Sequence, residues 1–352
     1  MMARLLSHDL PRSRGLALVL IVIVAGLAAA PVVFPGVKAL DVAAKTLVFI
    51  LLVASYDLLL GYTGIVSFAH TMFFGIGAYG VAIASTRLGA GWGALALGLA
   101  AALAVSLVLS LLIGLFSLRV KAIFYAMITL AVAAAFQTLA SQLSGFTGGE
   151  DGLSFSAPTL LSPSFEWGWL DGKRLSYWLL FVVVAALFLL LLRIVNSPFG
   201  RVLQAIREND FRAEAIGLRT VVYRTLSNVL AALFATVAGG LLALWLRYTG
   251  PDTTLSFEIM LDVLLIVVIG GMGTMYGAVV GAVLFMLAQN YLQTLLGAAS
   301  KALAGMAGVA PLAALFTPER WLLWLGLLFV LSVYHFPTGV VGRLRALRRG
   351  AR

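Results

Sequence analysis

Cysteine is absent from this chain of 352 residues. The protein therefore has no disulfide, no thiolate nucleophile and no sulfur ligand for a metal. Histidine is scarce as well: His8, His70 and His335 lie far apart in the sequence and show no metal-ligand spacing. No set of Asp, Glu, His or Ser residues has the spacing of a catalytic constellation either. We expect a protein without a metal site and without enzymatic activity of its own.

Charged residues are few, at 11% of the chain, whereas a soluble domain carries about 25%. Hydrophobic residues make up 62%, and apolar runs of about twenty residues, each long enough to cross a bilayer as a helix, recur along the chain. The composition predicts one all-α integral membrane domain over residues 1–352. The net charge of +10 comes from basic residues in short loops, which is typical of cytoplasmic loops and gives no indication of nucleic-acid binding.

Ten apolar segments are predicted to be transmembrane helices. They cover residues 15–34, 40–60, 72–86, 92–115, 122–143, 176–195, 225–247, 257–270, 276–297 and 320–336. We expect the first to be an uncleaved helix rather than a signal peptide. With ten spans, all basic segments fall on the cytoplasmic side: the N-terminus, Arg119 with Lys121, residues 193–224 and the Arg-rich C-terminal tail. The loop over residues 144–175 then lies outside.

That external loop divides the chain into two five-helix halves, residues 1–143 and 176–340. A short echo supports this division, since "YTGIVSF" begins at Tyr62 and "YTGPDTTLSF" at Tyr248. The first is predicted near the cytoplasmic side and the second near the outside. We therefore expect halves of inverted topology.

One charged segment, residues 193–224, interrupts the apolar sequence with six Arg, one Asp and two Glu. Each charge would cost about 2.5–3.5 kcal/mol at the centre of a bilayer, so the segment must lie outside the hydrocarbon. Within it, residues 196–224 form the predicted cytoplasmic loop. Ser197 can cap a helix that has Pro198 at its first position, and Gly217 can end it.

The helical pattern of the charged segment has two faces. The residues of the apolar face are Phe199, Val202, Leu203, Ile206, Ala213 and Ile216. Asn209 and Asp210 intrude near that face, so we expect two short helices with a bend. Glu208 and Arg212 are predicted to form an i,i+4 ion pair. The segment is either a solvated connector on the membrane surface or a docking surface for a cytoplasmic partner.

Two glycine-rich stretches predict irregular helix breaks: "GYTGIVSFAHTMFFGIGAYG" at residues 61–80 and "GGMGT" at residues 270–274. Irregular backbone at membrane depth is tolerated only where it is buried in protein or lines a wet cavity. The breaks therefore indicate either tight helix packing, as at Gly75, Gly77 and Gly80, or a translocation path. The candidate path residues are Tyr62, Thr63, Gly64, Ser67, His70, Gly270, Gly271, Gly273 and Thr274. The chain has no G-x-x-x-x-G-K-[ST] motif, so any ATP that drives it is bound by another chain.

These motifs resemble a known transporter family. Arg-Glu-Asn-Asp at residues 207–210, followed by Glu-Ala-Ile-Gly at 214–217, resembles the cytoplasmic EAA coupling loop of bacterial ABC importer permeases. The glycine follows Glu214 more closely than in the broader consensus. Residues 61–80 and 256–285 resemble signature segments of the branched-chain amino acid (Liv-type) permeases, and the M-type subunit more than its H-type partner. The resemblance reaches from about residue 40 to residue 285.

The resemblance implies one subunit of a type II-like ABC importer permease in the bacterial inner membrane, with both termini in the cytoplasm. It implies an H-type partner permease, two ATPase subunits that bind ATP and Mg, and a periplasmic substrate-binding protein, with no cofactor in this chain. The residues that would contact the ATPase are Arg207, Glu208, Asn209, Asp210, Glu214, Ala215 and Gly217. The cargo would be a branched-chain amino acid, a net-neutral molecule that needs no fixed counter-charge.

Two alternatives stay open. Urea and short-amide permeases share most of these features. A stand-alone secondary transporter would explain the spans but would leave the charged segment without a partner. Such a carrier would be expected to have a deep carboxylate or ion site, whereas Asp57, Glu258 and Asp262 are predicted near the ends of their spans.

The predicted topology can be tested with single cysteines, because the natural chain has none. We expect an impermeant maleimide to label Ser156→Cys but not Gln204→Cys on intact cells, since the first lies in the external loop and the second in the charged segment. Permeabilised cells are the control and should label at both positions. The reverse pattern on intact cells would contradict the orientation of every span.

Overall fold

The computed structural model describes residues 14–33, 36–117, 122–162, 165–167, 170–304, 316–336 and 338–346. Arg119, Lys121 and most of the basic residues of the two termini lie outside this part. Each of the ten predicted spans coincides with a helix. These helices are α2 (Arg14–Val33), α3 (Val37–Asp57), α4 (His70–Leu88), α5 (Trp92–Ser117), α6 (Ala122–Gln142), α8 (Gly172–Asn196), α11 (Thr220–Leu246), α13 (Phe257–Gly270), α14 (Met275–Ala304) and α16 (Trp321–His335).

Among the described residues, eight helical stretches are long and apolar enough to cross a membrane. They comprise α2, α5, α6, α8, α11, α14, α16 and the stretch from Pro251 to Gly270, which joins α12 (Pro251–Thr254) to α13. The protein is thus an all-α, multi-pass membrane protein with a few very short strands. Ten crossings and the inversion of the two halves stay predictions.

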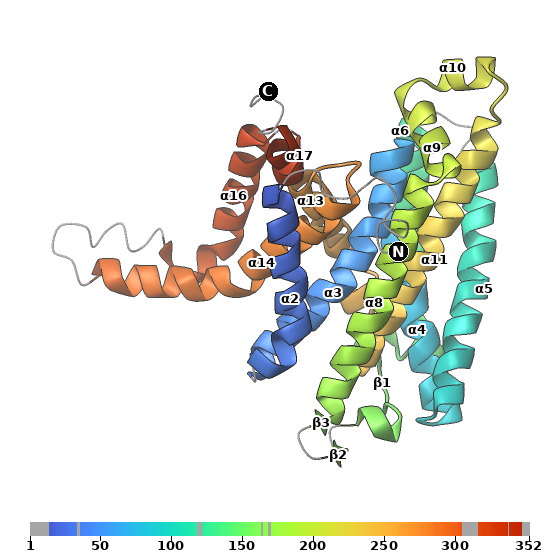
Figure 1. Ribbon diagram of the computed structural model, residues 1–352. Coiled ribbons are helices and arrows are strands. Elements are labelled where there is room, and N and C mark those ends of the chain that lie inside the picture. Colours follow the sequence, from blue (N-terminus) through green and yellow to red (C-terminus); the bar gives the residue numbers. More distant parts are fainter. Residues whose placement is uncertain are drawn as a thin grey trace.

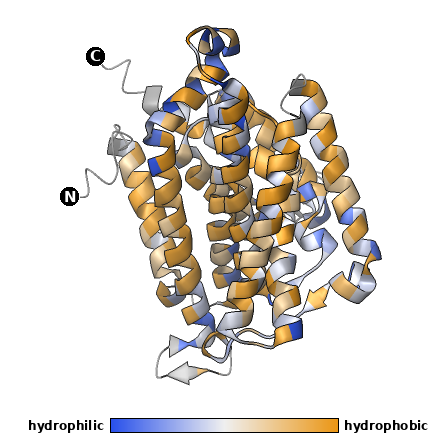
Figure 2. Ribbon diagram, turned by 90° about the vertical axis from the view of Figure 1, so that its right-hand side faces the viewer, coloured by the Kyte–Doolittle hydropathy of each residue, from blue (hydrophilic) through white to orange (hydrophobic). Residues whose placement is uncertain are grey.

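The interior of the bundle is built from α3, α4 and α11. Helix α3 is buried without interruption from Thr46 to Asp57 and packs on α11, α14 and α8. Helices α2, α5, α6 and α16 are peripheral and expose many Leu, Val and Ile side chains. Figure 2 shows these apolar residues along the helices and the polar residues mainly at the two ends. Such a surface fits a hydrocarbon environment rather than water.

Helices α4 and α11 touch through their backbones. A Cβ atom on Gly77 would overlap the carbonyl of Thr236, and one on Gly239 would overlap the carbonyl of Phe74. The predicted close approach at Gly75, Gly77 and Gly80 is confirmed, since a side chain at each would collide with α11, α5 or Leu255. Small residues have this role in membranes, where no hydrophobic force drives helices together.

Buried polar side chains then tie α11 to its other neighbours. Thr236 Oγ1 donates to Ser106 Oγ of α5 at 2.6 Å. The amide of Asn228 donates to the carbonyl of Ser110 at 2.9 Å and accepts from the hydroxyl of Tyr125 at 3.3 Å. These bonds connect α11 to α5 and α6 where water is excluded.

The segment between α6 and α8 is folded rather than an open loop. It contains α7 (Ser144–Thr147), η2 (Gly149–Asp151), β1 (Leu153–Ser154), η3 (Thr159–Leu161), β2 (Glu166–Trp167) and β3 (Leu170–Asp171). Strand β1 pairs with β4 (Tyr248–Thr249), which directly follows α11. Helix α8 begins at Gly172, four residues before the predicted start. In Figure 1 these strands lie at the end of the molecule opposite α10 (Asp210–Ala215).

The contact between α4 and α11 predicts a steric test. Replacing Gly77 with Val should destabilise the protein by about 1–3 kcal/mol or more, because the new side chain must force two backbones apart. Gly26→Val is the matched control, since a Cβ at Gly26 on peripheral α2 meets nothing within 4 Å. Thermal unfolding in detergent measures the difference. Equal melting temperatures for the two variants would contradict the packing.

Candidate functional site

The charged segment forms two helices, as predicted: α9 (Pro198–Glu208) and α10, with a bend at Asn209, whose backbone is extended. The Asn209 side chain accepts from the backbone N–H of Arg212 at 3.0 Å and so caps α10. Glu208 and Arg212 fall on separate helices, so the predicted i,i+4 pair is wrong. Gly217, at a φ of +90°, follows the end of α10.

Helix α9 begins with Pro198 at its first position, as expected. The Ser197 hydroxyl does not cap it, however, and instead donates to the carbonyl of Ile194 at 2.6 Å. Leu203 and Ile206 of α9 are fully buried against the bundle. The charged segment is therefore packed on the bundle through α9.

Polar contacts attach α10 to the start of α11. The carboxylate of Asp210 forms an ion pair with Arg224 of α11 at 3.0 Å. The hydroxyl of Thr220 donates to Glu214 at 2.7 Å. Two residues assigned to ATPase contact thus also attach α10 to the start of α11.

Two apolar side chains are exposed to solvent at this end of the molecule: Phe211 of α10 and Ile216, which directly follows α10. Phe211 is 86% exposed and Ile216 is 76% exposed, and α10 stands clear of the bundle at one end of the molecule (Figure 1). Ile216 was expected on the buried face. That expectation is wrong because α10 ends at Ala215 and Ile216 leaves the helical register. Phe211 was missed, although an aromatic residue among charges was the available signal. Exposed apolar residues rimmed by charge are typical of a docking point.

Both predicted helix breaks are present. Helix α3 continues into the π-helical turn η1 (Leu58–Thr63), Gly64 has a φ of +75°, and α4 begins only at His70. Helix α13 ends at Gly270, and Gly271 and Gly273 have φ values of +113° and +76°. A residue other than glycine rarely adopts these left-handed backbone conformations.

The two breaks and α9 meet at one point, which we call the glycine junction: Asp57, Gly61, Gly64, Arg207 and Gly273. The guanidinium of Arg207 donates to the carbonyl of Gly61, and its aliphatic stem lies against Gly64. The backbone N–H of Gly273 donates to the carboxylate of Asp57 at 2.9 Å. Three segments far apart in sequence are thereby joined, which the sequence alone did not indicate.

The other candidate path residues surround this junction and are mostly buried. His70 shares a hydrogen bond with the hydroxyl of Ser55 at 2.9 Å. The Thr63 hydroxyl donates to the carbonyl of Leu58 at 2.8 Å and shares a second bond with Ser227 at 3.0 Å. Tyr62 and Ser67 are also buried, and the Thr274 hydroxyl donates to the carbonyl of Gly271 at 2.7 Å. These groups fix the shape of the breaks; that they line the path stays a prediction.

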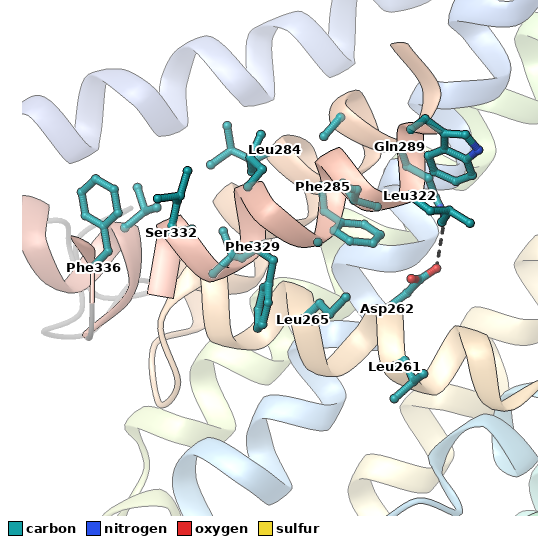
Figure 3. Close-up of a pocket in the computed structure, with 18 of the residues that line it drawn as sticks. Leu261, Asp262, Leu265, Leu284, Phe285, Gln289, Leu322, Phe329, Ser332 and Phe336 are labelled. Carbon is teal, nitrogen blue, oxygen red and sulfur yellow. Dashed lines mark hydrogen bonds between the residues drawn. The ribbon is translucent and has the colours of Figure 1, made fainter. Parts of the chain in front are cut away.

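A cavity of about 890 Å³ lies elsewhere, between α13, α14 and α16 (Figure 3). Its walls are largely apolar, and the carboxylate of Asp262 accepts from the Gln289 amide at 3.3 Å on one side. Ile269 lines it, but the nine candidate path residues do not. The structure therefore separates this cavity from the glycine junction.

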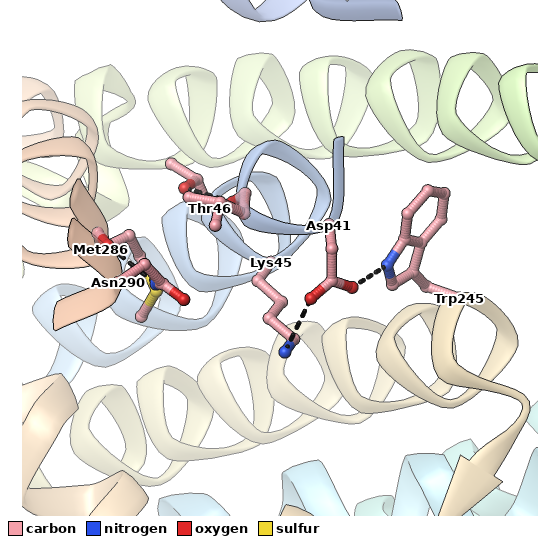
Figure 4. Close-up of polar contacts among 7 residues, drawn as sticks. Asp41, Lys45, Thr46, Trp245, Met286 and Asn290 are labelled. Carbon is pink, nitrogen blue, oxygen red and sulfur yellow. Dashed lines mark hydrogen bonds and ion pairs between the residues drawn. The ribbon is translucent and has the colours of Figure 1, made fainter. Parts of the chain in front are cut away.

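A second charge pair, not singled out from the sequence, lies half-buried near the start of α3. Asp41 and Lys45 of α3 form an ion pair at 2.9 Å, and the indole of Trp245 of α11 donates to Asp41 at 2.8 Å (Figure 4). The i,i+4 spacing of opposite charges within a predicted span was the available signal. This pair neutralises both charges near the end of α3 opposite the junction.

Residues 38–333 match the family described as the permease component of the branched-chain amino acid transport system. The chain belongs to this family. The match runs from α3 into α16 and includes the glycine junction and the charged segment. This permease is thus the membrane component of a transporter.

Named relatives support the assignment. The high-affinity branched-chain amino acid transport system permease proteins LivM of Salmonella typhimurium and Escherichia coli are each 28% identical over 274 residues, which cover 72% of this chain and 63% of theirs. A probable LivM of Methanocaldococcus jannaschii is 25% identical over 229 residues, 64% of this chain and 61% of its own. The matches thus span less than two thirds of these relatives. No solved structure matches the permease.

Proposed function

We propose that this permease is one transmembrane subunit of an ATP-driven importer of branched-chain amino acids in a bacterial inner membrane. The observation that carries the proposal is the charged segment, which is bonded to the first helix break through Arg207 and carries the exposed tip of Phe211 and Ile216. A tip of this kind suits a groove on a cytoplasmic ATPase. The ATPase subunits bind ATP and Mg, and α9 passes their motion to the bundle.

The remaining partners follow from the same proposal. An H-type permease completes the membrane unit, and a periplasmic binding protein delivers cargo at the end that carries β1 and β4. In this orientation the charged segment and both termini are cytoplasmic, in agreement with the positive-inside pattern. A stand-alone carrier would have no use for a rigid charged segment with exposed apolar side chains, which favours the importer.

The proposed cargo is a net-neutral, apolar amino acid. The LivM relatives are named for branched-chain amino acid transport. The side chains around the breaks are hydroxyls, an imidazole and small residues, which suit a molecule without net charge. An unpaired ion would need a fixed counter-charge at such depth. Urea or a short amide would also suit this chemistry, so cargo needs a direct test.

The docking tip predicts a binding defect. The double variant Phe211→Ser with Ile216→Ser should weaken ATPase association by about tenfold or more, because exposed apolar anchors contribute most of the energy of such interfaces. Leu160→Ser is the control, since Leu160 is 43% exposed at the opposite end. Association is measured by titrating the ATPase onto the purified permease. Undiminished binding by the double variant would exclude the tip as the docking point.

The cargo assignment predicts competition in uptake. Cells that lack their own systems but carry this permease with its cognate partners should take up radiolabelled leucine, and excess isoleucine or valine should reduce that uptake. Labelled urea is the comparison, because it is the alternative cargo of similar polarity. Uptake of urea without competition from leucine would remove the branched-chain assignment and leave the importer standing.

A further inference from the structure

Arg207 connects α9 to the helix breaks. It lies in the last turn of α9, one residue before the helix ends at Glu208. Its guanidinium donates to the Gly61 carbonyl in η1, and the same nitrogen lies 2.9 Å from the point where a Cβ of Gly273 would stand. One side chain of the coupling loop therefore touches both helix breaks at once.

Asp57 occupies the other side of the same contact. Its carboxylate is 1% exposed, and its Oδ1 accepts from Gly273. Its Oδ2 is buried and has no hydrogen-bond partner among the described residues. A buried carboxylate oxygen without a partner is costly, and a buried charge is retained where a cation balances it. Arg207 approaches the same two glycines as Asp57, since both side chains lie against Gly61 and Gly273.

The backbone between these two side chains is irregular and tightly packed. The π-helical turn η1 is a wide, uncommon turn of the kind that recurs at functional sites. Gly61 is packed so closely that a Cβ there would overlap both the Asp57 carboxylate and the Gly273 backbone. A small displacement of Arg207 therefore alters the position of one break relative to the other.

We propose that Arg207 and Asp57 form a two-position latch that passes the motion of the coupling loop to both helix breaks. In the present state Arg207 holds the Gly61 carbonyl, and Asp57 holds Gly273. When the ATPase moves α9, the guanidinium shifts to the free Oδ2 of Asp57, which weakens the bond to Gly273 and lets α13 and α14 move away from η1. This inference rests on the proposed importer function and assigns positioning residues within it.

The test compares Arg207→Gln, Asp57→Asn and the double variant with Arg201→Gln, an exposed arginine six residues earlier on α9. Each permease is reconstituted with its partner permease, ATPase subunits and binding protein, and leucine uptake and ATP hydrolysis are measured together. Each single variant should lose about tenfold or more in leucine transported per ATP, the effect of losing one hydrogen bond to a charged group. The double variant should be no worse than either single variant.

The conservative replacement Arg207→Lys separates position from charge. Lysine keeps the charge but lacks the planar fork of arginine, so uptake should be only partly restored. Subunit assembly is measured for every variant, and Asp57→Asn keeps an acceptor for Gly273, so its fold should be retained. Normal coupling in Arg207→Gln, or additive losses in the double variant, would overturn the latch.

A direct readout of the movement uses spin labels at Gln204→Cys on α9 and Met272→Cys in the second break, both exposed positions. Their separation should change on ATP binding in the otherwise natural chain and should stay constant with Asp57→Asn. No change in either would overturn the latch. The two proposals fail in different ways. If neither the natural chain nor Arg201→Gln supports ATP-dependent uptake, the importer function is contradicted. If the junction variants keep normal coupling, only the latch is contradicted.

Discussion

Backbone groups released at a helix break must find partners inside the protein, because the hydrocarbon of a bilayer offers none. This constraint explains how the permease is arranged around its two breaks. The N–H of Ile65 donates to the carbonyl of Leu59 at 3.0 Å, and the N–H of Phe68 donates to the Thr129 hydroxyl of α6 at 3.1 Å. Gly273 is satisfied by Asp57, and Gly61 by Arg207. Three of these four groups therefore bond to a different neighbouring element, and the N–H of Ile65 is satisfied within its own break.

The same constraint explains why charges lie where they do. The Asp57 carboxylate is needed at the junction because a backbone N–H points toward it in a dry interior. Asp41 and Lys45 balance each other at the other end of α3. A chain with few charged residues thus places several of them where irregular or polar groups would otherwise be unsatisfied. The charged segment is joined to the bundle by electrostatics as well as by packing.

Local features of this fold could be predicted from the sequence, whereas their spatial combination could not. The length of the apolar runs located the helices, and Asn209 with Asp210 indicated the bend between α9 and α10. Both features depend only on residues that are close together in the sequence. The meeting of Gly61, Gly273 and Arg207 depends on how distant helices pack, and a single sequence carries no record of such contacts. Ile216 was misplaced for a related reason, since one residue beyond a helix end the helical periodicity no longer decides which way a side chain points.

Helix α11 gives the molecule a mechanical property that extends beyond the junction. It runs for 27 residues without a break, which corresponds to roughly 40 Å. Near its first turns Arg224 forms an ion pair with Asp210 of the charged segment, and directly after its last turn β4 is paired with β1 of the segment between α6 and α8. Helix α11 therefore connects the charged segment at one end of the molecule to the folded segment between α6 and α8 at the other end, with no irregular turn between them.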